Sequence, residues 1–432
     1  MVNVRNDGGL ILRMDETSRM NIENPKGSGT THVGRAGSRL AAVGIITSHT
    51  LQHLYMHGFH VILPVIYTSL RLTPVAVGLI GTIRQVSSGV FTLIGGFILD
   101  KYQHRRVLVL YLSLLFMGLG YLLVGLSPGY RFILASIGLA GAAGSIWHPA
   151  ALSLLSQQYP ERRGFMLAVH RSSGNIGDAL GPLVVGALLL LLVWQKILFG
   201  AFPIAVAMAL FLWVTLRRAG DWQQLTDQTT PQRTIGEQFG TLKRLLNDRG
   251  LIILFLVSGI SGLGQGSIML WLPIYLQETQ GMGSLGIGMH LGLLSGVGIA
   301  STPAIGILSD RLGRNRVILM VLIANATIAL FMALVGSGIM LTILVGFMGT
   351  CLFALNPLVQ ARTLDIAEGK RLEGSMIGLI WGNNAIFNGV SPVLVGWLIT
   401  LLGYDTLFWY VASVNFIAAL FAIRLLTSVT RT

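Results

Sequence analysis

The sequence predicts an all-α polytopic membrane protein. Of the 432 residues, 53% are hydrophobic and only 11% are charged, whereas soluble domains carry about 25% charged residues. Apolar runs of about 20 residues, the length that spans a bilayer as a helix, follow one another along most of the chain. Several short motifs also recur at a nearly constant offset. Together these observations predict twelve transmembrane helices in two pseudo-symmetric six-helix bundles.

The predicted spans are interrupted by one long polar segment. Residues 1–40 are polar and predict a disordered cytoplasmic arm without a cleaved signal peptide. Residues 218–249 predict a cytoplasmic linker, with a short amphipathic helix around 235–246, between an N-terminal bundle at 41–217 and a C-terminal bundle at 250–427. The predicted spans are 41–70, 75–99, 106–127, 131–156, 163–193, 197–217, 250–277, 285–309, 316–336, 339–361, 374–402 and 405–427.

The basic residues predict the orientation of the chain. The formal net charge is +13, but most Lys and Arg fall in the termini and in alternate loops, the pattern of cytoplasmic loops. The exceptions are Arg71, Arg131 and Lys196 in the opposite loops and Arg84 and Arg171 within spans. We therefore expect a multi-pass protein of the cytoplasmic (inner) membrane with both termini in the cytoplasm, and no nucleic-acid partner. The single Cys351 excludes an internal disulfide framework.

The two halves of the chain repeat each other. Gly96, Asp100 and Lys101 return as Gly306, Asp310 and Arg311, 210 residues later. Leu63-Pro64 returns as Leu272-Pro273, Pro149 as Pro357, and Pro182 with Gly186 as Pro392 with Gly396. Matches in the same order at nearly one offset predict parallel repeats, related by an axis along the membrane normal.

This layout resembles the major facilitator superfamily of secondary transporters. The loops after the second and eighth predicted spans resemble that family's loop motif: Gly96, Asp100, Lys101 and Arg105 in the first copy, and Gly306, Asp310, Arg311, Gly313 and Arg314 in the second. The first copy departs from the motif at Gln103 and His104. Gly177, Gly181, Pro182 and Gly186 resemble the family's antiporter motif, with Val185 as a departure. Trp147-His148-Pro149 and Gly174-Asn175 are similar to the fosmidomycin resistance branch.

The resemblance implies a cytoplasmic gate built on the two loop motifs. Asp100 and Asp310 each follow the last apolar residue of a span, beside basic residues. A carboxylate at such a boundary accepts bonds from a neighbouring helix N-terminus, so it can latch two helices in one conformation and release them in another. The alternative is a purely topological role, in which the basic residues anchor the loop inside.

Asp178 is the one acid that lies deep in a predicted span. Arg171, Asn175 and Asp178 follow at i, i+4 and i+7, so we expect them to line one helix face, with the glycines on the opposite face smoothing the contact with a neighbouring helix. Ionisable groups at such depth usually face a bundle interior or wet cavity. Asp178 is therefore a candidate for proton coupling or substrate contact; a structural role in helix packing is the alternative.

The first predicted span carries a stripe of four histidines. His49, His53, His57 and His60 lie at i, i+4, i+8 and i+11 on one helix face. Histidine titrates near physiological pH and is a common metal ligand, so the stripe could carry protons, bind a soft cation or bind an anion. Metal ligation needs convergent ligands. The sequence offers His148 and Asp178 but no cysteine pair or further acid, so we expect no bound metal.

The internal symmetry separates scaffold from specificity. Paired positions such as the loop acids predict architecture, whereas the histidines, Arg171 and Asp178 have no ionisable counterpart in the second half. The C-terminal bundle instead offers hydrogen-bonding and stacking residues as cavity candidates: Gln265, Asn356, Trp381, Asn384 and Asn388. Arg84, in the second span, can pair with an anionic substrate or with a backbone carbonyl.

The residues and the resemblance together predict a transporter and not an enzyme. We expect proton-coupled efflux of a small organic solute, in the manner of drug antiporters, by a monomer without a cofactor. Two alternatives stay open: proton-coupled uptake of a small metabolite, either anionic or neutral, and a non-transporting membrane sensor or scaffold that keeps the fold. The chain has no nucleotide-binding Gly-x-x-x-x-Gly-Lys-(Ser/Thr) loop, which argues against direct ATP coupling.

Overall fold

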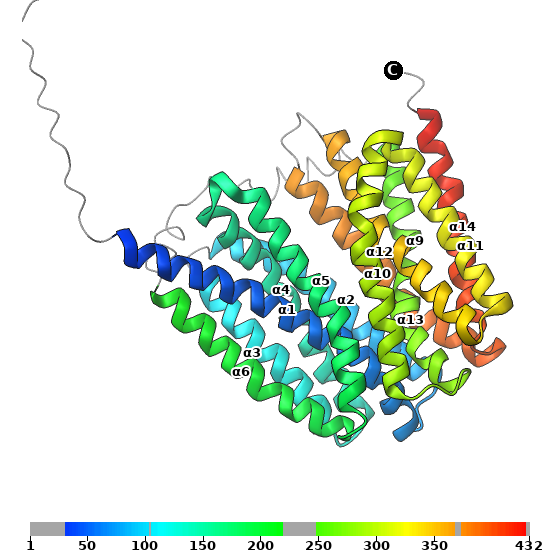
Figure 1. Cartoon of the computed structure of the whole chain (residues 1–432), viewed down its shortest axis with the longest axis horizontal. Coiled ribbons are helices and arrows are strands. Elements are labelled where there is room, and N and C mark those ends of the chain that lie inside the picture. The colour runs from blue at the N-terminus through cyan, green and yellow to red at the C-terminus, as the bar shows by residue number, and fades with distance from the viewer. Residues whose placement is uncertain (1–30, 103–104, 219–247, 368–372, 429–432) are drawn as a thin grey trace, which may run out of the picture.

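The computed structural model describes residues 31–102, 105–218, 248–367 and 373–428. Within them the chain folds into twelve α-helices of membrane-spanning length (Figure 1). The N-terminal bundle contains α1 (Thr31–Ser69), α2 (Pro74–Lys101), α3 (Arg106–Gly125), α4 (Tyr130–Gln158), α5 (Arg163–Leu188) and α6 (Trp194–Arg218), with a short 3-10 helix at Pro160–Arg162. The C-terminal bundle contains α9 (Arg249–Glu278), α10 (Ser284–Leu312), α11 (Arg314–Val335), α12 (Gly338–Ala367), α13 (Glu373–Leu402) and α14 (Thr406–Ser428).

These bounds confirm the predicted fold class and differ from the predicted segments mainly at one end. Helix α1 begins at Thr31, ten residues before the expected start of the bundle at residue 41. A helix continues through polar residues when nothing breaks its backbone hydrogen bonds, whereas a hydropathy pattern stops where the apolar run stops. The predicted linker helix around 235–246 lies outside the described residues.

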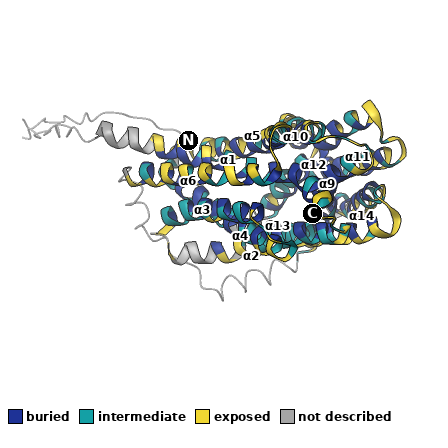
Figure 2. Ribbon diagram, turned by 90° about the horizontal axis from the view of Figure 1, so that it is seen from below, coloured by how far each residue is buried: buried dark blue, intermediate teal, exposed yellow. Residues whose placement is uncertain are grey.

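The two bundles repeat the same packing. In the N-terminal bundle α1 packs on α5 and α6, and α3 packs on α4 and α6; in the C-terminal bundle α9 packs on α13 and α14, and α11 on α12 and α14. The bundles meet through two equivalent contacts, α2 on α13 and α5 on α10, which Figure 2 shows from a second direction. The pseudo-symmetry predicted from the repeated motifs is confirmed.

Ten of the described helices are long and apolar enough to cross a membrane by composition alone, and α1 and α5 are not among them. These two helices carry the histidine stripe and the Asp178 stretch, which lower their mean hydropathy. They pack along each other within the same bundle, so each shields the polar groups of the other from lipid. Polar residues at membrane depth are tolerated in this way when they face protein or water.

Small residues bring the two bundles together at one end. A Cβ on Gly186 would lie 2.7 Å from the Ser284 carbonyl oxygen, and one on Gly396 would lie 2.5 Å from the Pro74 carbonyl oxygen. Gly78 and Gly288 make equally close backbone contacts across the interface, with Pro392 and Pro182. We call this end, which carries loops 70–73, 189–193, 279–283 and 403–405, the closed end, because backbone there packs directly on backbone.

Polar bonds also cross the closed end. The hydroxyls of Tyr67 and Tyr404 lie 2.7 Å apart, and Gln277 donates to the Pro64 carbonyl oxygen at 3.3 Å. Burial, together with the hydrogen bond to Tyr67, raises the pKa of Tyr404. The Tyr404 hydroxyl therefore keeps its proton at neutral pH, and the bond between the two tyrosines persists over the physiological range.

Candidate functional site

The site begins where glycines let α5 lie against α1. A Cβ on Gly177 would lie 2.7 Å from the His53 Cβ, and one on Gly181 would lie 2.6 Å from the Leu54 carbonyl oxygen. Only residues without a side chain permit this approach, which brings the short carboxylate of Asp178 within reach of α1. The other two residues of the antiporter-like motif, Pro182 and Gly186, face α10 instead, so one stretch of α5 contacts both bundles.

Asp178 binds two histidines through one carboxylate oxygen. Its Oδ1 lies 2.6 Å from His53 Nδ1 and 3.0 Å from His57 Nε2. Asp178 and His57 are buried and His53 is half-buried. At these distances the imidazole N–H groups donate and the carboxylate accepts, as charge-assisted hydrogen bonds do.

Further histidines extend this arrangement deeper into the N-terminal bundle. The His49 ring lies 4.5 Å from that of His53 and stacks at 3.8 Å on that of His170, measured between centroids. His49 Nδ1 donates to the His170 carbonyl oxygen at 2.7 Å, and the His148 ring lies 5.2 Å from that of His49. Trp147 stacks against His49. His49 is thus buried among α1, α4 and α5, whereas the other three stripe histidines line the cavity described next.

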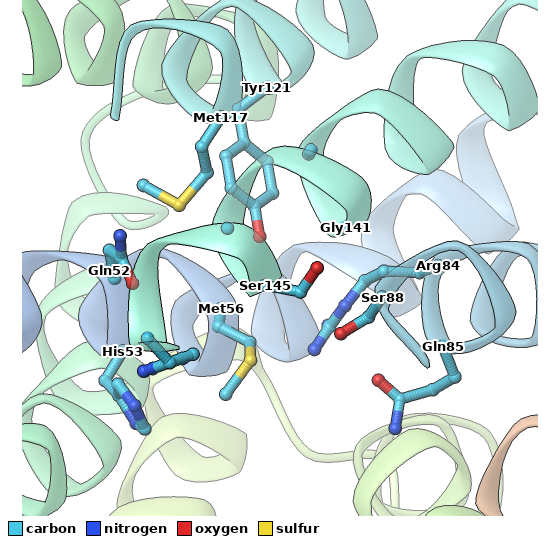
Figure 3. Close-up of a pocket in the computed structure, with 13 residues that line it drawn as sticks. Gln52, His53, Met56, Arg84, Gln85, Ser88, Met117, Tyr121, Gly141 and Ser145 are labelled. Carbon is cyan, nitrogen blue, oxygen red and sulfur yellow. The ribbon is translucent and has the colours of Figure 1, made fainter. Parts of the chain in front are cut away.

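A cavity of about 220 Å³ lies between the two bundles. Its N-terminal wall includes His53, His57, His60, Arg84, Arg171 and Asp178, and its C-terminal wall includes Gln265, Met269, Leu270, Phe353 and Asn388. A smaller space of about 60 Å³ continues from it into the N-terminal bundle, past Gln52, Met56, Gln85 and Tyr121 (Figure 3). His53 and Arg84 line both spaces, so the two spaces adjoin.

Four amides are linked by hydrogen bonds at the C-terminal wall, and of these Gln265 and Asn388 line the cavity while Asn356 and Asn384 do not. Asn356 donates to Gln265 Oε1 at 3.0 Å, and Asn384 donates to Asn356 Oδ1 at 3.4 Å and to the Ser258 carbonyl oxygen at 3.2 Å. Asn388 continues the chain toward Asn384 at 3.5 Å. The side chain of Trp381, also a cavity candidate, lies outside the described part.

The two bundles fill equivalent space from opposite helices. In the N-terminal bundle the histidines come from α1 and the glycines from α5: a Cβ on Gly174 would meet the His49 ring. In the C-terminal bundle the glycines come from α9: Gly262 faces the Asn384 amide and Gly266 faces the Asn388 side chain. The two bundles therefore differ in which helix supplies the side chain. The first helix (α1) supplies it in the N-terminal bundle, and the fifth (α13) supplies it in the C-terminal bundle.

One expectation about α5 is wrong. The glycines do not lie opposite the polar stripe: Gly174, Gly177, Gly181 and Asp178 are all buried toward α1. At about 100° per residue, Asp178 lies only about 60° from the centre of the glycine face. Arg171 is exposed and Asn175 is half-buried. Arg171 lines the cavity, but among the described ion pairs the partners of Asp178 are His53 and His57.

Several residues of the site were not predicted from the sequence. His170 lies at i, i+4, i+7 and i+11 with the glycines of α5, so the periodicity that identified the α1 stripe would have found it. Gln52, Met56, Gln85 and Tyr121 carry no comparable signal, because polar and apolar residues of these kinds occur at many span positions. Only the packing of α1, α2, α3 and α4 brings them to one space.

Two groups of three residues have the spacing that a metal ion requires. The ligand atoms of His49, His53 and His148 lie within 4.8 Å of one another, as do those of His53, His57 and Asp178. The sequence offered His148 and Asp178 as ligands beside the stripe, and the structure brings both to it, Asp178 through the α1–α5 contact. The spacing of the second group also fits two imidazoles that share protons with one carboxylate.

The loop motifs lie at the end opposite the closed end. Asp310 pairs with Arg314 at 3.3 Å, and Arg314 also binds Asp365 of α12 at 2.7 Å. Gly313 has φ +91°, a conformation that glycine adopts readily, and forms the sharp turn from α10 into α11. Arg311 and Arg105 are exposed, and no atom would contact a Cβ on Gly306. The side chains of Asp100 and Lys101, and the surroundings of Gly96, lie outside the described part.

Comparison with known proteins gives this architecture a family. A model of the Major Facilitator Superfamily matches residues 45–386 and 302–431. The fosmidomycin resistance protein of Escherichia coli K12 is 24% identical over 366 residues, which cover 84% of this chain and 87% of that protein. The multidrug resistance protein MdtG of Yersinia enterocolitica is 27% identical over 354 residues, covering 80% and 82%.

Solved structures agree in fold. A bacterial homologue of the human lysosomal transporter Spinster, in an inward-facing and unoccupied conformation, superposes with a TM-score of 0.74 at 13% identity, over 92% of this chain and 96% of that one. A peptide transporter superposes with the same TM-score at 16% identity, covering 90% and 94%. The family match covers most of the chain, and the fold has the two six-helix bundles and the repeated loop motifs described above. The protein therefore belongs to the major facilitator superfamily of membrane transporters.

Proposed function

We propose that this protein exports a small organic solute across the cytoplasmic membrane in exchange for protons, and that Asp178, His53 and His57 share the coupling proton. The observation that carries the proposal is the position of the Asp178 carboxylate, which accepts hydrogen bonds from two imidazoles in the wall of the cavity. Three titratable groups in direct contact bind protons as one coupled unit.

A proton bound to this unit can act on conformation because of where the unit lies. A protonated carboxyl is neutral and carries a donor at one oxygen, so its hydrogen bonds with the two histidines lose the strength that the negative charge gave them. Those hydrogen bonds join α1 to α5, and α5 packs on α10 of the other bundle. Protonation therefore changes a contact of α5, a helix that also forms part of the interface between the bundles. The two bundles move against each other at this interface in alternating access.

The distribution of basic residues supports an orientation for this conformation. The loops around 102–105, 159–162 and 313 carry Arg105, Arg162, Arg163, Arg314 and Arg316, and the positive-inside rule places them in the cytoplasm. The closed end then faces outward, and the chain is inward-facing, as the similar solved transporter is described to be. The names of the two curated relatives, both resistance proteins, support export as the direction.

Alternating access between two bundles of one chain needs no second subunit, so we propose a monomer. The transmembrane proton gradient supplies the driving energy of this cycle, so we propose that it needs no cofactor. The two solutes need to favour different conformations, since a ligand shifts an equilibrium only by its differential affinity.

The test uses everted membrane vesicles from cells that express the protein. A panel of toxic organic acids, amides and amines first identifies a compound whose toxicity the protein reduces. Everted vesicles acidified inside should then accumulate that compound, and a protonophore should abolish the accumulation. Asp178→Asn should still bind the compound but lose accumulation driven by the pH gradient, because an amide of the same size cannot exchange a proton. Glu161→Gln, at an exposed acid of the loop before α5, is the matched control.

Three outcomes would contradict the proposal. Gradient-driven accumulation by Asp178→Asn equal to that of wild type would remove the coupling role. Accumulation only in right-side-out vesicles would mean uptake. If transport required added zinc and a chelator abolished it, the histidine groups would be assigned to a metal ion.

A further inference from the structure

We propose that the transported solute is a small organic anion, and that Arg84 binds its carboxylate, phosphate or phosphonate group. This inference rests on the proposed function in one respect, that the cavity between the bundles is the transport site. It adds the chemical class of the substrate and names the residue that recognises it.

Arg84 is a buried cation that faces the cavity. It lies on α2 with 9% of its surface exposed, and its side chain reaches into the space that Met56 and Ser145 also line (Figure 3). Gly141 of α4 packs against the Arg84 backbone, where a Cβ would lie 2.5 Å from the Arg84 carbonyl oxygen. The helix is therefore held closely at this point, which fixes the origin of the guanidinium.

Arg84 has no carboxylate partner within the described residues. None of their ion pairs includes it. Its hydrogen bond goes from Nη1 to His60 Nε2 at 3.3 Å, and a ring nitrogen that accepts this bond carries no charge. Asp178 is the one acid of the described cavity walls, and its Oδ1 already binds His53 and His57. A buried charge without a partner is strongly disfavoured, so an anion that enters the cavity is attracted to this position.

The rest of the cavity fits the body of a small organic acid. With neutral histidines, the wall of the larger space carries Arg84 and Arg171 against Asp178, a net charge of +1. Met56, Met269, Leu270 and Phe353 provide apolar contact, and the amides of Gln265 and Asn388 face them from the other bundle. The volume of about 220 Å³ is below the range of roughly 300–1,000 Å³ typical of sites for drug-sized ligands. It favours a compact anion over a bulky amphiphile.

The guanidinium also suits the anionic group in geometry. Its planar donors match two oxygens of a carboxylate or phosphate at once, whereas a lysine presents a point charge. Arg84 lines both spaces of the cavity, and its described hydrogen bond engages Nη1. A bidentate contact can therefore form without displacing the bond to His60.

A thermal-shift titration of the purified full-length protein tests this assignment without a pH gradient. The probes are benzoate, phenylphosphonate and inorganic phosphate, with benzamide as the neutral analogue and benzylamine as the cation. At least one anion should stabilise the wild type, and benzamide and benzylamine should not. Arg84→Gln should lower the affinity for that anion on the order of tenfold to a hundredfold. Arg84→Lys should recover part of the loss. Arg131→Gln, at an exposed arginine of α4, should bind as wild type does.

A second measurement needs no ligand. Because the Arg84 charge is unpaired in the empty protein, Arg84→Met should raise the thermal stability of the ligand-free protein. A fall in stability would show that the guanidinium is a structural element, and would overturn the proposal. So would stabilisation by benzylamine or benzamide but by none of the anions, stabilisation by none of the five probes, or unchanged anion affinity in Arg84→Gln.

The two proposals fail separately. If anions bind in an Arg84-dependent way but a pH gradient drives no transport, the substrate class stands and proton coupling falls. If a pH gradient drives transport of a neutral or cationic compound in both wild type and Arg84→Gln, coupling stands and the anion site falls.

Discussion

Replacing Gly181 by alanine tests the contact on which the site depends. The new Cβ would lie 2.6 Å from the Leu54 carbonyl oxygen and 3.0 Å from the Leu54 Cα. Both atoms belong to backbone, so the side chain cannot avoid them by changing rotamer, and α1 and α5 need to separate by a distance on the order of 0.5 Å. One turn away, this shift stretches the 2.6 Å bond between His53 and Asp178.

The free-energy change follows from two opposing effects. Overpacking a close contact costs about 1–3 kcal/mol, and alanine regains up to about 1 kcal/mol through its greater helix propensity. Gly181→Ala should therefore lose up to about 3 kcal/mol and lower Tm by a few degrees. Gly296 of α10 is the matched control, because no atom lies within 4 Å of a Cβ built there; Gly296→Ala should be neutral or stabilising.

The assay combines thermal unfolding of purified protein with pH-driven transport in everted vesicles. We expect Gly181→Ala to lose both stability and coupling, and Gly296→Ala to lose neither. If the two variants were equally stable and equally active, then α1 and α5 would not touch as described, and the Asp178–histidine contact would have no fixed geometry.

Three further predictions concern the cavity wall and the two ends of the transporter. In a Cys351→Ser background, His57→Cys and His60→Cys should react with a polar thiol reagent and His49→Cys should not; the reverse pattern would place the α1 stripe on the wrong face. Asp310→Ala removes an exposed ion pair worth at most about 1 kcal/mol, so expression should be normal while transport falls, and unchanged turnover would exclude a gate at this loop. Tyr67→Phe removes the hydroxyl bond to Tyr404, a net loss of about 0.5–1.5 kcal/mol, and should populate conformations with a wider closed end; an unaltered distance distribution between spin labels across that end would contradict this.

The spans and the two bundles could be predicted because they depend on one-dimensional signals. A bilayer demands about 20 apolar residues for each crossing, and an offset of about 210 residues survives in the positions of glycines, prolines and loop acids. The offset even matches helix starts: Pro74 of α2 corresponds to Ser284 of α10, and Arg163 of α5 to Glu373 of α13.

The chemistry of the site could be predicted only in part. Asp178 and the histidines are exceptional for membrane helices, so composition alone identifies them. Which of them touch depends on the rotation of α1 against α5, and hydropathy contains no information about that rotation when both helices are polar on more than one face. The sequence therefore placed Asp178 on one helix face with Arg171, seven residues earlier, whereas its partners His53 and His57 lie on a different helix, 125 and 121 residues earlier.

In the N-terminal bundle glycines of α5 face histidines of α1, whereas in the C-terminal bundle glycines of α9 face asparagines of α13. This difference limits how such a protein can change during evolution. In the C-terminal bundle, a histidine at Gly266 would collide with the Asn388 side chain, and removing that asparagine alone would leave a void. Moving a histidine from one bundle to the other therefore requires two substitutions together. After either substitution alone, the helix contact is either overpacked or contains a void. Such reciprocal epistasis tends to keep the histidine-bearing half and the amide-bearing half of the transporter distinct, even as individual cavity residues change.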